Sequence, residues 1–363
     1  MLAVMRIVAT TVIRHVPPGT CSGRMLILEL ADDQVSVVSD TRLPENRFRE
    51  VDPNRRGGTR GLRCVTVDGD QLLVTDSTGI SILSARSGEV VGRVEHPLMG
   101  GVHCVITVPG GLAVTATHSD TVLAIDRTGT ELWRWRPTDS PSLQRLLTMP
   151  QPVDPTALGD FRDPSVLADH VHDVTHLNSL VRDGDDLLVS LGSALTHDRR
   201  GALPTSDPGR VRFREDAWHP VPGQWRSAHI IVRLTLAGGT APGGESVDLT
   251  STLEPQVLWV GPAKHFPNHD LLPVASGVWF NESNTCEVCL VEAGRITRRI
   301  LVPGQFLRGM TRGHEGHVIV GTQQPLTLHD VDLDQARVVR SWRIPGDAAE
   351  SFTWLAAYPA EAD

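Results

Sequence analysis

The sequence has almost no lysine: Lys264 is the only one, and arginine supplies the remaining positive charge without any extended basic run. Lysine and arginine together number 34 against 43 aspartates and glutamates, so the net charge is -9 and the pI is about 5.9. A nucleic-acid backbone or an anionic membrane surface binds to concentrated basic patches. The composition therefore argues against nucleic acid and membrane partners.

Long apolar stretches are also missing, and none approaches the roughly 20 residues that a membrane-spanning helix needs. Residues 1–16 are partly apolar, but Arg6 and Arg14 interrupt them and no small-residue cleavage site follows. We interpret this segment as a strand and expect a cytoplasmic protein.

The five cysteines are an odd number without the spacing of a disulfide framework. Cys286 and Cys289 form the one CxxC, but residues three apart in a strand point to opposite faces, and no second CxxC completes a tetrahedral zinc site. The cysteines therefore indicate a reducing compartment rather than a metal or redox centre.

What the sequence does contain is an internal repeat. Residues 62–97 give four short apolar segments, LRCVTV, QLLVT, GISIL and EVVGRV, separated by DG and SG turns. Residues 102–135 repeat the pattern with VHCVITV, LAVTA, TVLAID and ELWRW. Four strands in about 40 residues, with almost no helical periodicity, are typical of one propeller blade.

Three further copies begin near residues 175, 268 and 306, which makes five visible blades. A sixth is predicted from both ends of the chain, with residues 351–357 as one strand and residues 6–15, 24–30 and 35–40 as the others. Sharing a blade between the termini closes the ring and removes exposed sheet edges. The sequence thus predicts an all-β, six-bladed β-propeller with four-stranded blades, a single domain over residues 1–363.

Two long inserts interrupt this regularity, at residues 137–174 and 197–226. In a propeller, the connection between blades and the loop between a blade's second and third strands emerge at the same rim. Loops this long are usually lids or binding loops. We therefore expect both inserts to lie over one mouth of the channel.

Alignment of the blades on the start of the innermost strand brings five basic residues to one predicted position: Arg63, His103, His176, His269 and Arg308. The sixth blade offers Ser351. Alternation along a strand directs the residues two further on to the same channel. Four of these are apolar, Val65, Val105, Leu271 and Met310, and the fifth is Asn178.

A polar ring above an apolar floor predicts a small-molecule site, for an aromatic or anionic compound. Five basic side chains in one layer repel one another unless an anion, a metal or carboxylates compensate them. Asn178, Asp270 and His172 are the neighbouring candidates for substrate contact.

Several blade motifs resemble those of the arylsulfate sulfotransferase family: VTHLNSL at 174–180 with DGDDLLVS at 183–190, NHDLLP at 268–273 with GVWFN at 277–281, and LAID at 123–126 with GTELWRW at 129–135. The resemblance covers roughly residues 62–330. It implies a six-bladed propeller in which a channel histidine accepts a sulfuryl group from one phenolic ester and passes it to another phenol, with no nucleotide donor. One of His103, His176 and His269 is then the nucleophile, and Arg63 and Arg308 hold the sulfuryl oxygens.

Two other interpretations use the same fold. Three neutral imidazoles from His103, His176 and His269 are a possible ligand set for Fe²⁺, Zn²⁺, Mn²⁺ or Cu²⁺, as in an oxygenase or lyase. Alternatively the propeller is a binding scaffold without catalysis, although the Trp-Asp and Gly-His signatures of WD repeats are missing. Walker, HExxH and GxSxG motifs are missing too.

Overall fold

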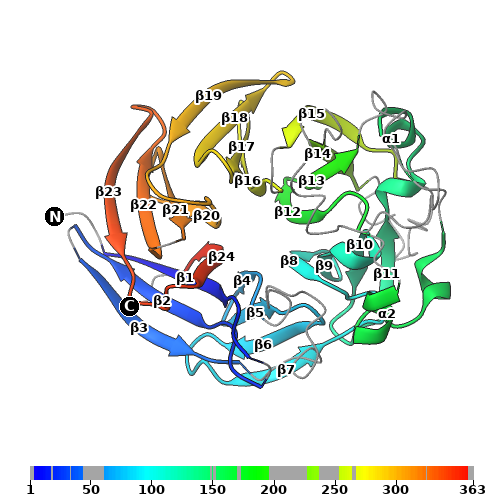
Figure 1. The fold of residues 1–363 in the computed structure, drawn as a ribbon, viewed down its shortest axis with the longest axis horizontal. Helices are drawn as coiled ribbons and strands as arrows, with labels where there is room; N and C mark the ends of the chain where they lie inside the picture. The colour runs from blue at the N-terminus through cyan, green and yellow to red at the C-terminus, as the bar shows by residue number, and fades with distance from the viewer. Residues whose placement is uncertain are drawn as a thin grey trace.

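The chain forms a ring of six sheets, each with four antiparallel strands, as Figure 1 shows. This computed structural model describes residues 4–17, 19–32, 34–43, 61–147, 149, 153–169, 173–195, 227–236, 253–263, 267–323 and 325–358. The predicted six-bladed β-propeller with four-stranded blades is confirmed. Apolar alternation with turn residues at short intervals is sufficient to specify these strands.

The blades follow chain order, and each is listed from the channel outward. The first three blades are β4 (Val65–Asp68), β5 (Gln71–Thr75), β6 (Ile80–Ser84) and β7 (Val90–Val94); β8 (Val102–Val108), β9 (Gly111–Ala116), β10 (Thr121–Ile125) and β11 (Glu131–Trp135); and β12 (Leu177–Asp183), β13 (Asp186–Leu195), β14 (Ser227–Thr235) and β15 (Gln256–Ala263).

The fourth and fifth blades are β16 (His269–Val274), β17 (Gly277–Glu282), β18 (Glu287–Glu292) and β19 (Arg295–Leu301); and β20 (Met310–Arg312), β21 (His317–Thr322), β22 (Thr327–Asp332) and β23 (Arg337–Arg343). The sixth blade takes its innermost strand, β24 (Glu350–Ala357), from the C-terminal part and the others, β1 (Met5–Ile13), β2 (Met25–Leu30) and β3 (Val35–Thr41), from the N-terminal part. The predicted closure by a shared blade is confirmed.

A buried carboxylate reinforces this closure. Glu350, 1% exposed at the start of β24, accepts hydrogen bonds from Thr11 Oγ1 at 2.6 Å and from Arg24 Nε and Nη2 at 2.7 and 2.9 Å. These contacts join the C-terminal strand to β1 and to the segment before β2. They pair a charge that is costly to bury alone.

We predict that Glu350→Ala lowers the free energy of unfolding by about 3 kcal/mol, because it removes a buried carboxylate with several donors and leaves the half-buried Arg24 guanidinium without its main partner. Glu29→Ala is the matched control, since Glu29 pairs with Arg6 at the half-exposed surface of the same blade and such pairs contribute less than about 1 kcal/mol. Urea denaturation of both variants measures the difference, and equal losses would contradict this role for Glu350.

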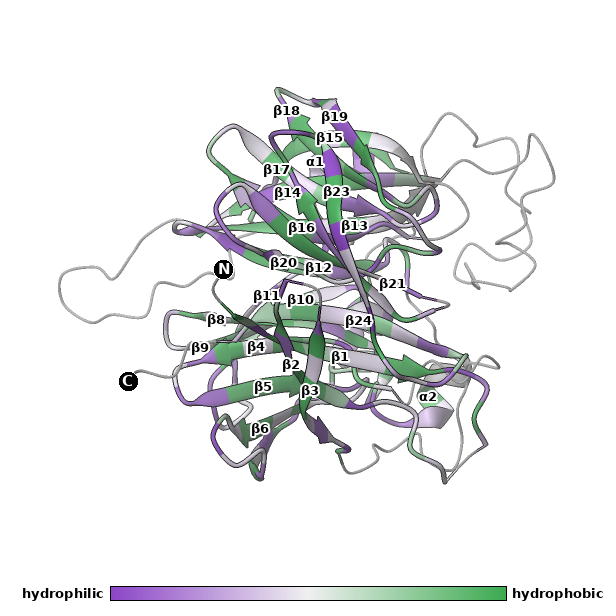
Figure 2. Cartoon of the chain, turned by 90° about the vertical axis from the view of Figure 1, so that its left-hand side faces the viewer, coloured by the Kyte–Doolittle hydropathy of each residue, from purple (hydrophilic) through white to green (hydrophobic). Residues whose placement is uncertain are grey.

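The hydrophobic core lies between neighbouring blades. The largest cluster of buried side chains runs through the first three blades and includes Trp133 and Trp135, the period-two pair of β11. In Figure 2, hydrophobic residues follow the strands within the ring, whereas outer strands such as β19 carry hydrophilic residues. This packing makes each innermost strand a firm support for side chains at its channel end.

The first insert is anchored on the second blade. It contains the helices α1 (Pro141–Leu146) and α2 (Pro164–Asp169), and its side chains Leu143, Leu147 and Phe161 are fully buried in the core. The second insert, 197–226, lies outside the described residues, and the lid role of both inserts stays a prediction. None of the helices in the described ranges is long and apolar enough to cross a membrane.

Candidate functional site

Strand pairing defines which residues occupy equivalent positions at the channel. In each of the first five blades, the fourth residue of the second strand pairs with one residue of the innermost strand: Val65, Val105, Leu180, Leu271 and Met310. Two residues earlier lie Arg63, His103, Asn178, His269 and Arg308. The predicted alignment is therefore correct in four blades and differs in the third, where Asn178 takes the position and His176 comes two residues before it.

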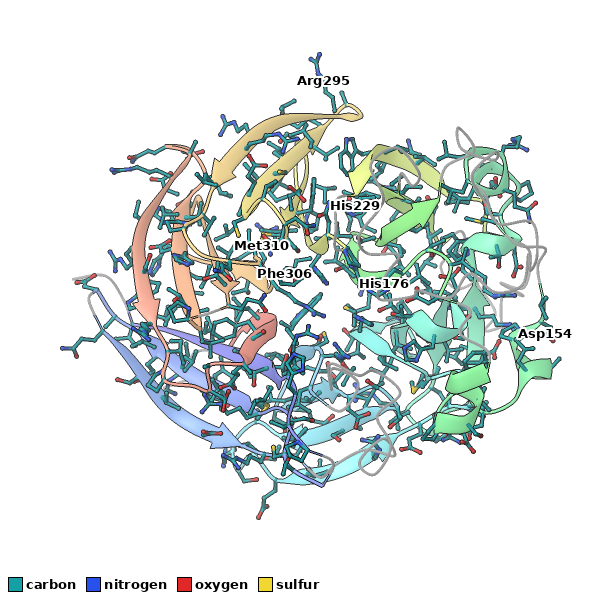
Figure 3. All side chains as sticks on the ribbon, in the orientation of Figure 1. Asp154, His176, His229, Arg295, Phe306 and Met310 are labelled. Carbon is teal, nitrogen blue, oxygen red and sulfur yellow. The ribbon has the colours of Figure 1, made fainter. Side chains whose placement is uncertain are left out.

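The layer beneath this ring is apolar in all five blades. Val65, Val105 and Leu180 are at most 1% exposed, and Leu271 and Met310 are both 7% exposed. The third blade contributes Leu180 here, not Asn178 as the sequence alignment indicated. Figure 3 places Met310 and His176 around the centre of the ring, together with Phe306.

β-Bulges reshape the starts of three innermost strands. The pairing register skips one residue in each of β8, β12 and β16, namely His103, Asn178 and Asp270. A bulge bends its strand and redirects the side chain of the extra residue, which is why bulges are frequent beside active sites. Local backbone geometry, and not strand alternation alone, thus sets the directions of these side chains.

The basic residues predicted to meet are related by one ring contact and by the action of their charges on one another. The rings of His103 and His176 pack edge to face with centroids 5.2 Å apart. Arg308 is close enough for its charge to lower the pKa of both His103 and His269, and Arg63 acts in the same way on His103 and on Arg308. We call these five residues, Arg63, His103, His176, His269 and Arg308, the cup.

The tautomer of His103 follows from its hydrogen bonds. Its Nδ1 lies 2.7 Å from the carbonyl oxygen of Gly101 and 2.7 Å from Thr117 Oγ1. A carbonyl oxygen only accepts, so Nδ1 carries the hydrogen and Nε2 keeps its lone pair. Burial, followed by the charges of Arg63 and its neighbours, lowers the pKa of His103 well below 6.5. His103 is therefore a neutral imidazole at pH 7 with a lone pair on Nε2.

His176 is oriented by a carboxylate. Its Nδ1 donates to Asp173 Oδ2 at 2.7 Å, and this bond fixes the orientation of the ring. His176 also has a left-handed backbone with φ of +53°. For a residue other than glycine this conformation is strained, and it persists only where surrounding contacts enforce it.

His269 is held on the other side of the cup. Its Nδ1 lies 2.8 Å from Ser283 Oγ, and its ring meets Phe306 edge to face with centroids 5.6 Å apart. Burial and the charge of Arg308 lower the pKa of His269 well below 6.5. Phe306 also has a left-handed backbone, with a φ of +48°. An aromatic residue with a strained backbone therefore lies beside the cup.

Arg308 is the most unusual residue of the site. It is 6% exposed, and its buried Nε has no hydrogen-bond partner within the described ranges. Burial, then the charges of Arg63 and Arg14, lowers its pKa to about 9, although Asp270 opposes this. A guanidinium normally buries only with paired donors. The cup therefore concentrates positive charge on a side chain with unused hydrogen-bonding capacity.

Sequence reasoning missed Arg14. It follows β1 at the channel end of the sixth blade, where its backbone N donates to Ala349 O. Its charge lowers the pKa of both Arg308 and His269. The sequence prediction placed Ser351 at this blade's position, and Ser351 Oγ instead donates to Gln323 of the fifth blade. The sequence contained one signal for this residue: Arg14 lies at the end of the strand predicted over residues 6–15.

The three candidates for substrate contact have different positions. Asn178 Nδ2 donates to the carbonyl oxygen of Asn268, and Asp270 Oδ2 accepts from Asn281 Nδ2 and from Gly309 N, both at 2.8 Å. The bonds to Asn268 and from Gly309 link one blade to the next, whereas Asn281 lies on the same blade as Asp270. Burial raises the pKa of Asp270 to about 6. His172 lies outside the described residues.

The chain was compared with known proteins. No family model and no curated protein matches it. Among solved structures, it is similar to a chain of a Nidogen/Laminin complex, with 11% identity, 98% of each chain covered and a TM-score of 0.51. It is similar as well to a protein of unknown function from Bacteroides caccae, with 11% identity, 98% of each chain covered and a TM-score of 0.50. At this identity the likeness shows the fold alone.

The metal interpretation depends on how the three histidines of the cup are arranged. Across the described ranges, no group of three or more His, Cys, Asp or Glu side chains is arranged to hold a metal ion. His103, His176 and His269 are thus not positioned as a ligand set, and two buried guanidinium groups beside them disfavour a cation.

The buried histidines predict a pH dependence of stability. Below about pH 6.5 the unfolded chain binds protons on His103 and His269 that the folded protein does not, so the free energy of unfolding falls as the pH falls. Each residue contributes about 1.4 kcal/mol per pH unit until its own folded pKa is reached. Urea denaturation between about pH 6.5 and pH 5 gives the slope of the free energy of unfolding against pH, and we expect this slope to be about 1.4 kcal/mol per pH unit smaller in His269→Gln than in the wild type. The same slope in both proteins would contradict the prediction.

Proposed function

We propose that this protein is an enzyme that binds a small molecule by an oxyanion group and transfers that group through an imidazole of the cup. The observation that carries the proposal is Arg308, a buried guanidinium whose Nε has no hydrogen-bond partner within the described ranges and whose pKa is lowered by the charge of a second buried arginine, Arg63. A tetrahedral oxyanion offers negative charge to both guanidinium groups and an acceptor to Arg308.

The state of the histidines supports transfer in addition to binding. A nucleophilic imidazole must be neutral, and its reacting nitrogen must hold a lone pair. His103 meets both conditions, because its hydrogen is on Nδ1 and its pKa is lowered. The Asp173–His176 pair is suited to general acid–base work, since the carboxylate orients the ring through its hydrogen bond to Nδ1.

The proposed reaction has two steps. In the first, the Nε2 lone pair of His103 attacks the central sulfur or phosphorus atom, the bond from that atom to the ester oxygen breaks, and the departing oxygen takes a proton from His176. In the second, an acceptor hydroxyl gives its proton to His176 while its oxygen attacks the same atom, and the bond to Nε2 breaks. Arg63 and Arg308 neutralise the oxygens throughout.

The blade motifs that resemble arylsulfate sulfotransferases favour a sulfuryl group and an aryl ester. Phe306 beside His269 supports an aromatic substrate in the same way. We therefore put aryl sulfates first and aryl phosphates second as donors.

The test is release of 4-nitrophenol from 4-nitrophenyl sulfate and 4-nitrophenyl phosphate by the purified protein, with and without phenol as acceptor. We expect release from one donor, faster with phenol, and a phenyl ester of the transferred group in the mass spectrum. Absence of release from both donors by a protein that binds inorganic sulfate would instead indicate a binding scaffold. Activity that a chelator removes and Zn²⁺ or Fe²⁺ restores would favour the metal alternative.

A further inference from the structure

One short turn of the second blade contacts both sides of the His103–His176 pair. The 3₁₀ turn Thr117–Ser119 joins β9 to β10 and is followed by Asp120, which has a left-handed backbone with φ of +49°. Thr117, Ser119 and Asp120 are all completely buried. The turn therefore belongs to the support of the cup and not to its surface.

Asp120 holds the residue before His176. Its Oδ1 accepts hydrogen bonds from Thr175 N at 3.1 Å and from Thr175 Oγ1 at 2.7 Å, across the boundary between the second and third blades. Two donors on one oxygen fix both the backbone and the side chain of Thr175. His176, the next residue, thereby receives its starting position from the neighbouring blade.

Thr117 holds the residue after His176. Its hydroxyl donates to the carbonyl oxygen of Leu177 and, since it has one hydrogen, accepts from Nδ1 of His103. The same hydroxyl thus contacts the ring of one histidine and the backbone that carries the other. Residues 175 and 177 are both fixed by this turn, on either side of the strained φ of His176.

We propose that Thr117 and Asp120 are positioning residues that set the relation of His103 Nε2 to His176 for the transfer reaction. This role rests on the proposed function, because it assigns a catalytic purpose to the spacing of the two rings. A left-handed non-glycine backbone costs about 1–3 kcal/mol and is retained where contacts over-determine it. Misplacing a catalytic group by about 1 Å costs roughly 10²-fold in rate.

The requirement at Asp120 is an acceptor oxygen and not a charge. Burial raises the pKa of Asp120 to about 7, and the nearby charge of Asp173 also raises it. The hydrogen bonds from Thr175 and the charge of Arg136 lower this pKa but do not outweigh burial. An asparagine presents the same Oδ1 to Thr175. The conservative variant therefore separates geometry from electrostatics.

Two measurements test the proposal. The first, which needs no substrate, follows the downfield Nδ1–H proton of His176 in its hydrogen bond to Asp173 by NMR. We expect this resonance to be lost or broadened in Asp120→Ala and Thr117→Val and kept in Asp120→Asn. The second is the transfer assay: kcat is expected to fall roughly 10²-fold in Asp120→Ala with KM nearly unchanged, and Asp120→Asn restores most of it.

Asp126→Ala is the matched control. Asp126 shapes the turn after β10, at the other end of the same strand, where it accepts from Thr128 and Thr130. We expect both measurements to match the wild type. If Asp120→Ala does not fold, Thr175→Val removes one of the two donors and takes its place.

The outcomes are distinguishable. An unchanged His176 resonance in Asp120→Ala and Thr117→Val overturns the positioning role whether or not the protein has transferase activity. A lost resonance in a protein without any transfer activity leaves the turn as the support of the ring pair and refutes the proposed reaction. Equal losses in Asp120→Asn and Asp120→Ala overturn the acceptor role of Asp120.

Discussion

Arg308→Met is expected to weaken oxyanion binding by the cup strongly and to leave the protein at least as stable as the wild type. Methionine fills a similar volume without a charge, and replacing a buried, poorly compensated charge by an apolar side chain is neutral or stabilising by about 1–4 kcal/mol. The charge-assisted hydrogen bonds of the guanidinium are lost at the same time, which lowers affinity for inorganic sulfate roughly 10²-fold.

Calorimetric titration with sulfate and phosphate measures the affinity, and urea denaturation measures the stability. Arg312→Met is the control, because Arg312 lies on the same blade but is exposed, with its guanidinium bonded to Pro273 O. Its anion binding should equal that of the wild type. A destabilised Arg308→Met that still binds sulfate would show that the guanidinium serves the fold and not a ligand.

His103→Asn is expected to lower kcat at least about 10⁴-fold, the scale of loss when a nucleophile is removed from an enzyme. Asparagine has no basic nitrogen, so the covalent intermediate cannot form. After brief mixing with ³⁵S-labelled aryl sulfate and quenching in alkali, the wild-type chain should carry label on a histidine and His103→Asn should carry none.

His317→Gln controls for the loss of a histidine, because His317 starts β21 at the other end of the blades. It should label and turn over like the wild type. Labelling that persists in His103→Asn would move the nucleophile to His176 or His269.

The architecture was predictable from sequence because a propeller repeats. Each blade buries the same pattern of apolar positions, so the 40-residue step from Arg63 to His103 predicts equivalent places in neighbouring blades. Four of the five aligned positions, Arg63, His103, His269 and Arg308, agree with strand pairing. The split sixth blade was also predictable, because a ring must close.

The third blade shows where this reasoning fails. A long insert precedes it, and the alignment on VTHLNSL was displaced by two residues, so that Asn178 and not His176 is equivalent to His103. His176 nevertheless contacts His103, because the two rings pack edge to face. Bulges arise from backbone contacts that sequence periodicity does not contain.

The supporting contacts were beyond sequence reasoning for a different reason. Asp120 and Thr175 are hydrogen-bonded although they are 55 positions apart. Thr117 bonds to His103 of the same blade and to Leu177 of the next blade. Single aspartates and threonines are common in turns, so nothing in their local pattern marks them. Only the packing of the third blade against the second brings them to the histidines.

The most direct measurement is a crystal structure with selenate, a sulfate analogue that anomalous scattering at the selenium edge locates. We predict one selenate in the cup, with its oxygens bonded to the guanidinium groups of Arg63 and Arg308 and its selenium facing His103 Nε2. Selenate elsewhere only, or guanidinium groups turned away from the channel, would contradict the account.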